Sequence, residues 1–250
     1  MTLRRDDFLG GRLSVWQPAQ GYRAGADAVM LAAACPARPG QQVLELGCGA
    51  GVAALCLARR VDLGVMGLER QPGYAELARR NADENGLPLR VVVGDLAQMP
   101  PDLRARHFDG VLMNPPYFGS GTRAPDAGRG TARHENTPLA DWLDAGLRRL
   151  RPGGWLAVIH RPERLGDLLA GLGTRAGAVC ILPIAARAGR DAGRVIVTAR
   201  KGRRDPMRLL PPFVMHAKPS HSADAEDLTP QATAVLRHCA AITVLSAENP

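Results

Sequence analysis

Short apolar runs alternate with longer segments of helical periodicity along most of this chain. The apolar runs occupy residues 41–47, 63–69, 89–95, 108–114, 152–160, 178–184 and 193–201, and helical patterns cover 52–60, 72–85, 138–150 and 165–172. Strands that alternate with helices predict a parallel sheet with crossover helices. Only eight residues, 185–192, separate the last two runs, which is too short a link for a crossover. The last two strands should therefore pair antiparallel.

The predicted architecture is an α/β, Rossmann-like fold. Its sheet should be seven-stranded and mostly parallel, with an antiparallel last strand and helices on both faces. We expect a single domain over residues 1–250, divided into an N-terminal segment (1–40), a core (41–201) and a basic C-terminal extension (202–250). Residues 119–135 and 202–227 are rich in glycine, proline and charge, so we predict loops there.

Composition narrows the choice of partner and compartment. The 32 Lys and Arg outnumber the 24 Asp and Glu, and the net charge of +8 suggests a polyanionic partner such as RNA. Lys201 and Lys218 are the only lysines, however, so the composition bias of a GC-rich genome would explain the same charge.

The five cysteines form no C-x-x-C pair and indicate buried thiols in a reducing cytoplasm, without a disulfide or metal site. No apolar run approaches the roughly 20 residues of a membrane span, and the acidic start lacks a secretory signal pattern.

A glycine-rich turn joins the first predicted strand of the sheet to its helix, in the stretch VLELGCGAGVAAL. Gly47, Gly49 and Gly51 allow a tight turn and a close approach of the backbone to a ligand. Residues 49–54 satisfy the dinucleotide pattern G-x-G-x-x-G/A loosely, whereas residues 45–51, beginning with Glu45, satisfy the S-adenosylmethionine pattern E/D-x-G-x-G-x-G fully. Both cofactors stay open at this point, and a glycine turn without any ligand is the third possibility.

Acidic residues end the next two predicted strands. Glu69 is placed to accept hydrogen bonds from ribose hydroxyls, which suits either cofactor. Asp95, followed by Leu96, is placed for an adenine amino group, as in enzymes that use S-adenosylmethionine. Asp95 could equally serve as a helix N-cap.

The fourth predicted strand ends in Asn114, Pro115, Pro116 and Tyr117. Neither proline has an N–H to donate, so the strand stops and the amide and the ring are held in a stiff loop. The simplest alternative is a structural turn, in which the prolines end the strand and the tyrosine packs in the core. The tetrad resembles the NPPY motif of amino-group methyltransferases, which act on adenine, cytosine, guanine or a glutamine amide. A dehydrogenase has no use for such a motif, so S-adenosylmethionine becomes the expected cofactor.

The resemblance implies a role for each part of the tetrad. The lone pair of an amino nitrogen is delocalised, which makes the nitrogen a poor nucleophile. The Asn114 side-chain oxygen and the Pro115 carbonyl would accept hydrogen bonds from this group and favour a pyramidal nitrogen, so catalysis would rest on positioning and electrostatics. Asn114 would also border the cofactor. Tyr117 would stack on a base turned out of its helix or loop.

Further segments resemble one bacterial family within this class, the tRNA adenine-N6 methyltransferases that modify adenine 37 beside the anticodon of a valine tRNA. Residues 21–33 resemble the family's segment that closes over the cofactor, with Gly25 and Asp27 in the matching places. Residues 132–160 and 193–202 are similar as well. The resemblance implies a class I methyltransferase fold, S-adenosylmethionine as cofactor and N6-adenine methylation of tRNA.

Three other functions compete with this interpretation. Release-factor glutamine methyltransferases share NPPY but carry an additional N-terminal helical domain, and only about 40 residues precede the first strand of the sheet here. Guanine-N2 rRNA methyltransferases usually have a second, duplicated domain. A non-catalytic RNA-binding module would not need the glycine turn, Glu69, Asp95 and NPPY together.

Basic residues near the tetrad and in the tail are the candidate RNA contacts. They are Arg123, Arg129 and Arg133 after NPPY, and Lys201, Arg203 and Arg204 after the last strand. Both groups could instead belong to ordinary solvated loops, and Arg133 could pair with Glu135.

Overall fold

The computed structural model describes residues 2–117, 137–218 and 227–244. The strands of its main sheet are β3 (Gln42–Leu46), β4 (Gly64–Glu69), β5 (Leu89–Val93), β6 (Phe108–Met113), β7 (Leu150–His160), β8 (Ala176–Arg187), β9 (Ala192–Lys201), β10 (Arg208–Leu209) and β11 (Phe213–His216). The α-helices are α1 (Ala26–Ala34), α2 (Val52–Arg60), α3 (Pro72–Asn85), α4 (Pro101–Arg104), α5 (Leu139–Arg149), α6 (Leu165–Leu172) and α7 (Pro230–His238).

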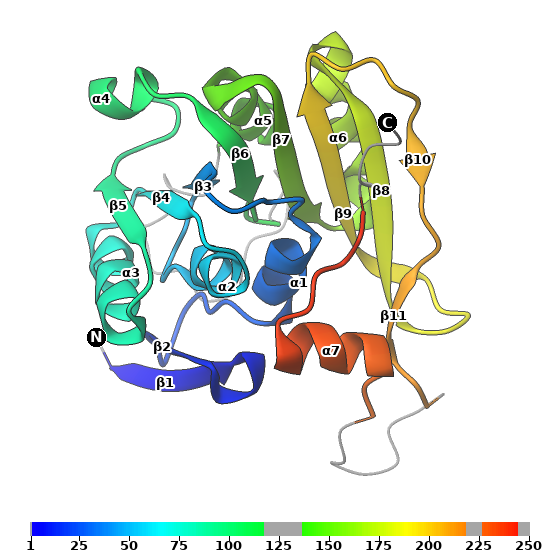
Figure 1. Ribbon diagram of the computed structural model, residues 1–250, viewed down its shortest axis with the longest axis horizontal. Helices are drawn as coiled ribbons and strands as arrows, with labels where there is room; N and C mark the ends of the chain where they lie inside the picture. Colours follow the sequence, from blue (N-terminus) through cyan, green and yellow to red (C-terminus); the bar gives the residue numbers. More distant parts are fainter. Residues whose placement is uncertain (1, 118–136, 219–226, 245–250) are drawn as a thin grey trace.

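All seven predicted strands form and lie in one sheet (Figure 1). Their order is β8-β9-β7-β6-β3-β4-β5, and neighbours from β7 to β5 pair parallel. β9 pairs antiparallel with both β7 and β8, as the short link between the last two runs predicted. The mostly parallel, Rossmann-like sheet expected from the sequence is therefore confirmed.

Helices cover both faces of the sheet, because neighbouring residues of a strand point to opposite faces. Val43 of β3 packs in one hydrophobic cluster with residues of α1, α2 and α3. The next residue, Leu44, packs in a second cluster with residues of α5 and α6. The central parallel strands β3 and β6 are buried on both sides, which explains why they read as nearly continuous apolar runs.

The structure differs from the sequence prediction at the two ends of the chain. The predicted loop at 202–227 contains β10 and β11, which extend the sheet by pairing parallel with the long edge strand β8. Pro211 and Pro212 separate these two short strands because neither can donate to the ladder. A hairpin of β1 (Leu3–Phe8) and β2 (Leu13–Pro18) and the helix α7 were also not predicted (Figure 1).

In the described part of the chain, no helix is long and apolar enough to cross a membrane. Over the same residues, no group of three or more His, Cys, Asp or Glu side chains could hold a metal ion. The five cysteines are free thiols, four of them buried and Cys239 half-buried.

Candidate active site

The predicted site residues gather at one edge of the sheet. Strands β3, β4, β5 and β6 run parallel, so their carboxyl ends meet there, at what we call the carboxyl edge. The glycine turn follows β3, Glu69 ends β4, Asp95 follows β5 and the tetrad follows β6. Ligands of open α/β sheets bind in the crevice beyond the carboxyl ends of the strands.

The three glycines of the turn have positive φ angles of 66°, 54° and 86° at Gly47, Gly49 and Gly51, a region that favours glycine. Their surroundings differ. A Cβ on Gly47 would lie 2.5 Å from the ring of Trp142, and one on Gly51 would lie 2.9 Å from a leucine side chain. A Cβ on Gly49 would meet nothing closer than the Tyr22 ring, at 3.8 Å. Gly47 and Gly51 are therefore needed for packing, whereas Gly49 borders space that a ligand could fill.

Two buried acidic side chains hold the backbone of the glycine turn in place. Glu45 Oε2 accepts a hydrogen bond from the Ala54 amide, 2.9 Å away, and so satisfies a free N–H in the first turn of α2. The Glu69 carboxylate accepts from the amides of Gly49, at 2.9 Å, and Gln71, at 2.8 Å. Both acids were predicted as cofactor ligands from the sequence. The structure adds that they fix the backbone on which a cofactor would rest.

Burial raises the pKa of the Glu45 carboxyl to about 8, and the nearby charge of Glu69 contributes to the rise. A raised folded-state pKa stabilises the fold fully below the unfolded pKa, near 4.5, and this contribution is lost as the pH rises towards 8. We therefore expect Glu45→Gln, which does not titrate, to gain unfolding free energy relative to wild type between pH 5 and 8, by up to about 1.4 kcal/mol per pH unit. Urea unfolding of both proteins across this range tests the prediction, and a difference that does not vary with pH would contradict it.

Asp95 lies in a tight turn after β5. Its Oδ1 accepts from the Ala97 amide at 2.9 Å, and its Oδ2 lies 3.6 Å from Arg70 Nη1. The next helix, α4, has Pro100 at its N-cap position. The alternative that Asp95 caps a helix is therefore wrong.

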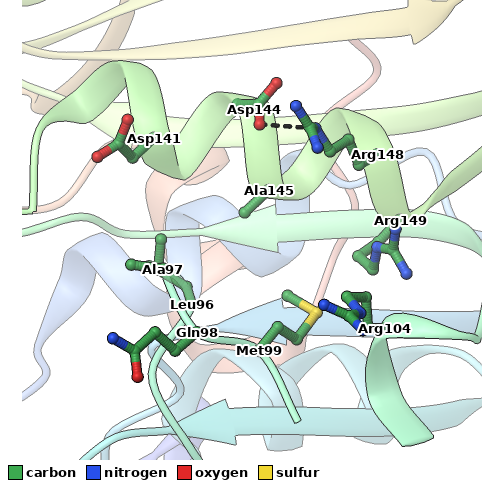
Figure 2. Close-up of a pocket in the computed structure, with 10 residues that line it drawn as sticks. All are labelled: Leu96, Ala97, Gln98, Met99, Arg104, Asp141, Asp144, Ala145, Arg148 and Arg149. Atoms are coloured by element: carbon green, nitrogen blue, oxygen red, sulfur yellow. Dashed lines mark ion pairs between the residues drawn. The ribbon is translucent and has the colours of Figure 1, made fainter. Parts of the chain in front are cut away.

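Leu96 borders a cavity of about 640 Å³ between residues 96–99 and α5 (Figure 2). The cavity is lined by Leu96, Ala97, Gln98, Met99, Arg104, Asp141, Asp144, Ala145, Arg148 and Arg149. No residue of the glycine turn or the tetrad belongs to this lining. The cavity thus adjoins the predicted adenine position without forming the centre of the site.

Asn114 connects the tetrad with the glycine turn. Its Nδ2 lies 3.5 Å from the hydroxyl of Tyr22, whose ring is the group nearest to the open side of Gly49. Its Oδ1 lies 3.0 Å from the hydroxyl of Tyr117. The amide of Asn114 therefore stands between the space beside Gly49 and the ring of the tetrad.

Tyr117 is anchored through its hydroxyl and its ring. The hydroxyl donates to Asp27 Oδ2 at 2.7 Å, and Arg194 Nε donates to the same oxygen at 2.7 Å. Burial, together with the negative charge of Asp27, raises the pKa of Tyr117, so the hydroxyl keeps its proton. The Arg194 guanidinium lies over the ring, 4.7 Å from its centroid, and the His160 ring meets it nearly edge-on at 5.1 Å. The stacking of Tyr117 on a base stays a prediction.

His160 at the end of β7 is buried and neutral. Burial lowers its pKa to about 4, and the positive charge of Arg164 acts in the same direction. Its Nδ1 accepts a hydrogen bond from the Arg161 amide at 2.8 Å. Sequence reasoning missed His160, Arg161 and Arg194. The signal was the antiparallel pairing of the last strands, since His160 pairs with Val195 and the start of β9 therefore lies at the carboxyl edge.

The segment before α1 lies against this edge. The Tyr74 hydroxyl donates to the Tyr22 carbonyl at 2.9 Å, which ties the segment to α3. Gly25 precedes α1, and a Cβ there would meet nothing within 4 Å. Asp27 reaches the tetrad through Tyr117. The predicted closing segment thus lies next to both the glycine turn and the tetrad.

Of the basic residues predicted as RNA contacts, those that the structure describes lie away from the tetrad. Arg123, Arg129 and Arg133 lie outside the described residues. Lys201 ends β9, whose residue Arg200 pairs with Trp155 near the start of the β7–β6 pairing, so Lys201 lies at the opposite, amino edge. Arg203 and Arg204 follow it, and Arg203 pairs with Asp205 at 2.8 Å. Since β9 runs antiparallel to β7, it ends at the edge where β7 and β6 begin, and this places Lys201, Arg203 and Arg204 away from the site.

Comparison with known proteins gives relatives for about two thirds of the chain. The family described as "Methyltransferase domain" matches residues 43–134. A tRNA1(Val) (adenine(37)-N6)-methyltransferase of Porphyromonas gingivalis is 36% identical over 173 residues, which cover 65% of this chain and 68% of the relative. A protein of the same name from Aeromonas hydrophila is 32% identical and covers 72% of this chain and 77% of the relative.

Two solved structures share the fold. A predicted O-methyltransferase of Agrobacterium tumefaciens has a TM-score of 0.71 and 30% identity, covering 90% of this chain and 100% of its own. A 16S rRNA N2 G1207 methyltransferase of Thermus thermophilus, in complex with AdoMet and guanosine, has a TM-score of 0.57 and 21% identity, covering 80% of this chain and 50% of its own. The sheet and helices described above are thus those of class I methyltransferases.

Proposed function

Since this chain belongs to the tRNA1(Val) (adenine(37)-N6)-methyltransferase family, we propose that it methylates N6 of an adenine in the anticodon loop of a tRNA. S-adenosylmethionine is the cofactor of this class. In the proposed complex, the amino group of the target adenine lies beside Asn114 and Pro115, beyond the end of β6. Tyr117 would contact the turned-out base, and Pro116 would keep the loop rigid.

One observation carries the proposal, which is the free hydrogen-bonding capacity of Asn114 Oδ1. Tyr117 has a single hydroxyl proton, and Asp27 Oδ2 is the closer acceptor, at 2.7 Å against 3.0 Å for Asn114 Oδ1. The hydroxyl therefore donates its hydrogen bond to Asp27, and the Asn114 oxygen keeps its lone pairs for a substrate amino group.

Hydrogen bonds to Asn114 Oδ1 and to the Pro115 carbonyl would draw the N6 protons out of the adenine plane and make the nitrogen pyramidal. These contacts strengthen as positive charge develops on the nitrogen, so they favour the transition state over the ground state. Asn114 is not a base, and the proton would leave after transfer. The neutral state of His160 adds no positive charge next to the reacting nitrogen.

The residues at the carboxyl edge fit the cofactor. S-adenosylmethionine, when bound, supplies an electrophilic methyl group on a sulfonium. Gly49 would let the backbone approach it, Glu69 would accept from ribose hydroxyls, and Asp95 with Leu96 would border the adenine. Gly25, Gly47, Gly51 and Glu45 would support these contacts through the backbone.

The decisive experiment uses labelled S-adenosylmethionine and separate pools of tRNA, rRNA and release factors. We expect label in tRNA only, recovered as N6-methyladenosine after nuclease digestion. An anticodon stem-loop in which one loop adenine at a time is replaced by guanine should lose label at a single position. Label in a release factor as N5-methylglutamine, or in rRNA as N2-methylguanosine, would overturn the proposal, because the tetrad alone serves all three acceptors.

A further inference from the structure

Two arginines approach the ring of Tyr117 from different strands. The Arg194 guanidinium, from β9, lies over the ring at 4.7 Å from its centroid. The Arg161 guanidinium, from the residue directly after β7, lies over the same ring at 5.6 Å. Both charges therefore stand beside the tetrad, at the edge where a turned-out nucleotide would enter.

The two charges are compensated differently. Arg194 donates to Asp27 at 2.7 Å and to the Gly193 carbonyl at 2.8 Å, and its side chain is 32% exposed. Arg161 is exposed, and across residues 2–117, 137–218 and 227–244 it forms no ion pair within 4.0 Å. Arg161 therefore adds a full positive charge to the mouth of the site, whereas the charge of Arg194 is neutralised by Asp27 within the site.

The backbone of Arg161 is held at the end of β7. Its amide donates to His160 Nδ1 at 2.8 Å, and Pro162 follows it at the start of a short 3₁₀ helix, Pro162–Arg164. Burial lowers the pKa of His160, and the positive charges of Arg164 and Arg161 lower it further. Arg164 pairs with Asp167 at 2.5 Å, which leaves Arg161 as the less compensated of the two.

We propose that Arg161 binds a backbone phosphate next to the target nucleotide, while Arg194 positions Tyr117 through Asp27. The proposal deepens the proposed function and rests on it. A nucleotide whose base reaches Asn114 keeps both flanking phosphates at the mouth of the site, and a planar guanidinium binds phosphate oxygens in a bidentate way. Such contacts fix register without reading sequence.

The test compares R161Q with R38Q as a matched control. Arg38 is exposed and lies just before β3, at the amino edge, so R38Q removes the same charge away from the site. Binding of an anticodon stem-loop is measured at several salt concentrations. We expect R161Q to weaken binding about tenfold at low salt and to flatten the slope of log affinity against log salt by about 0.7. R161K should keep most of the slope, and R38Q should bind like wild type.

The role of Arg194 has a different signature. R194Q should lower kcat at saturating RNA more than it raises KM, because Tyr117 and Asp27 lose a shared partner. The salt slope of R194Q should stay closer to that of wild type than the slope of R161Q does.

An R161Q slope equal to that of R38Q would overturn the phosphate contact. A flattened slope in R194Q but not in R161Q would transfer the contact to Arg194 and overturn the division of roles. The product assay distinguishes failure of this inference from failure of the proposed function. Label in tRNA together with an unchanged R161Q salt slope refutes only the phosphate contact. Label in no RNA refutes the proposed function.

Discussion

Replacement of Asn114 by alanine should lower the rate of methyl transfer by about 10²-fold or more. The side-chain oxygen is the acceptor that the Tyr117–Asp27 bond leaves available, and it contributes mainly when the substrate nitrogen becomes pyramidal. Cofactor affinity should change much less, because the amide lies beyond the glycine turn. Single-turnover rates at saturating tRNA and cofactor measure the first quantity, and calorimetry with S-adenosylmethionine measures the second.

Two variants separate chemistry from packing in this prediction. Asn114→Asp keeps an oxygen at the acceptor position and should lose less activity than Asn114→Ala. Tyr22→Phe removes only the hydroxyl that lies 3.5 Å from Asn114 Nδ2, and should have a small effect on the rate. A folded Asn114→Ala protein with wild-type turnover would mean that NPPY is only a turn in this chain.

Most of the sheet could be predicted because its signal is local. The central parallel strands are buried on two faces and read as apolar runs, and the length of a link decides between parallel and antiparallel pairing. The hairpin β1–β2 escaped prediction because LRRDDF alternates poorly and has one apolar residue at each end. β10 and β11 were not predicted because they form by pairing with the edge of β8, and no local sequence pattern indicates that pairing.

The candidate site could be predicted in part for a similar reason. Residues at or directly after the carboxyl ends of parallel strands must lie at one edge, so the sequence alone predicts that Glu69, Asp95 and Asn114 lie near one another. Arg194 and His160 depend on the register between β7 and β9, which the sequence does not specify. The direction of β9 was available from the sequence, and it already implied that Lys201 lies at the opposite edge from the tetrad.

Substitution of Gly49 by valine should abolish measurable S-adenosylmethionine binding while the fold is retained. The new side chain would enter the open space beside Gly49, where the nearest described atom to its Cβ belongs to the Tyr22 ring, 3.8 Å away. A φ of 54° costs an L-residue roughly 1–2 kcal/mol, which a domain of ordinary stability tolerates. Circular dichroism would establish folding, and calorimetry would measure affinity.

The control for backbone strain is Gly40→Val. Gly40 also has positive φ, at 79°, and open surroundings, but it precedes β3 at the amino edge. It should lose a similar amount of stability and bind the cofactor normally. Gly51→Val should differ from both, because its Cβ would lie 2.9 Å from a buried leucine and the protein itself would be destabilised. Equal affinities in folded Gly49→Val and Gly40→Val would place the cofactor elsewhere, since only the first substitution fills the space beside the turn.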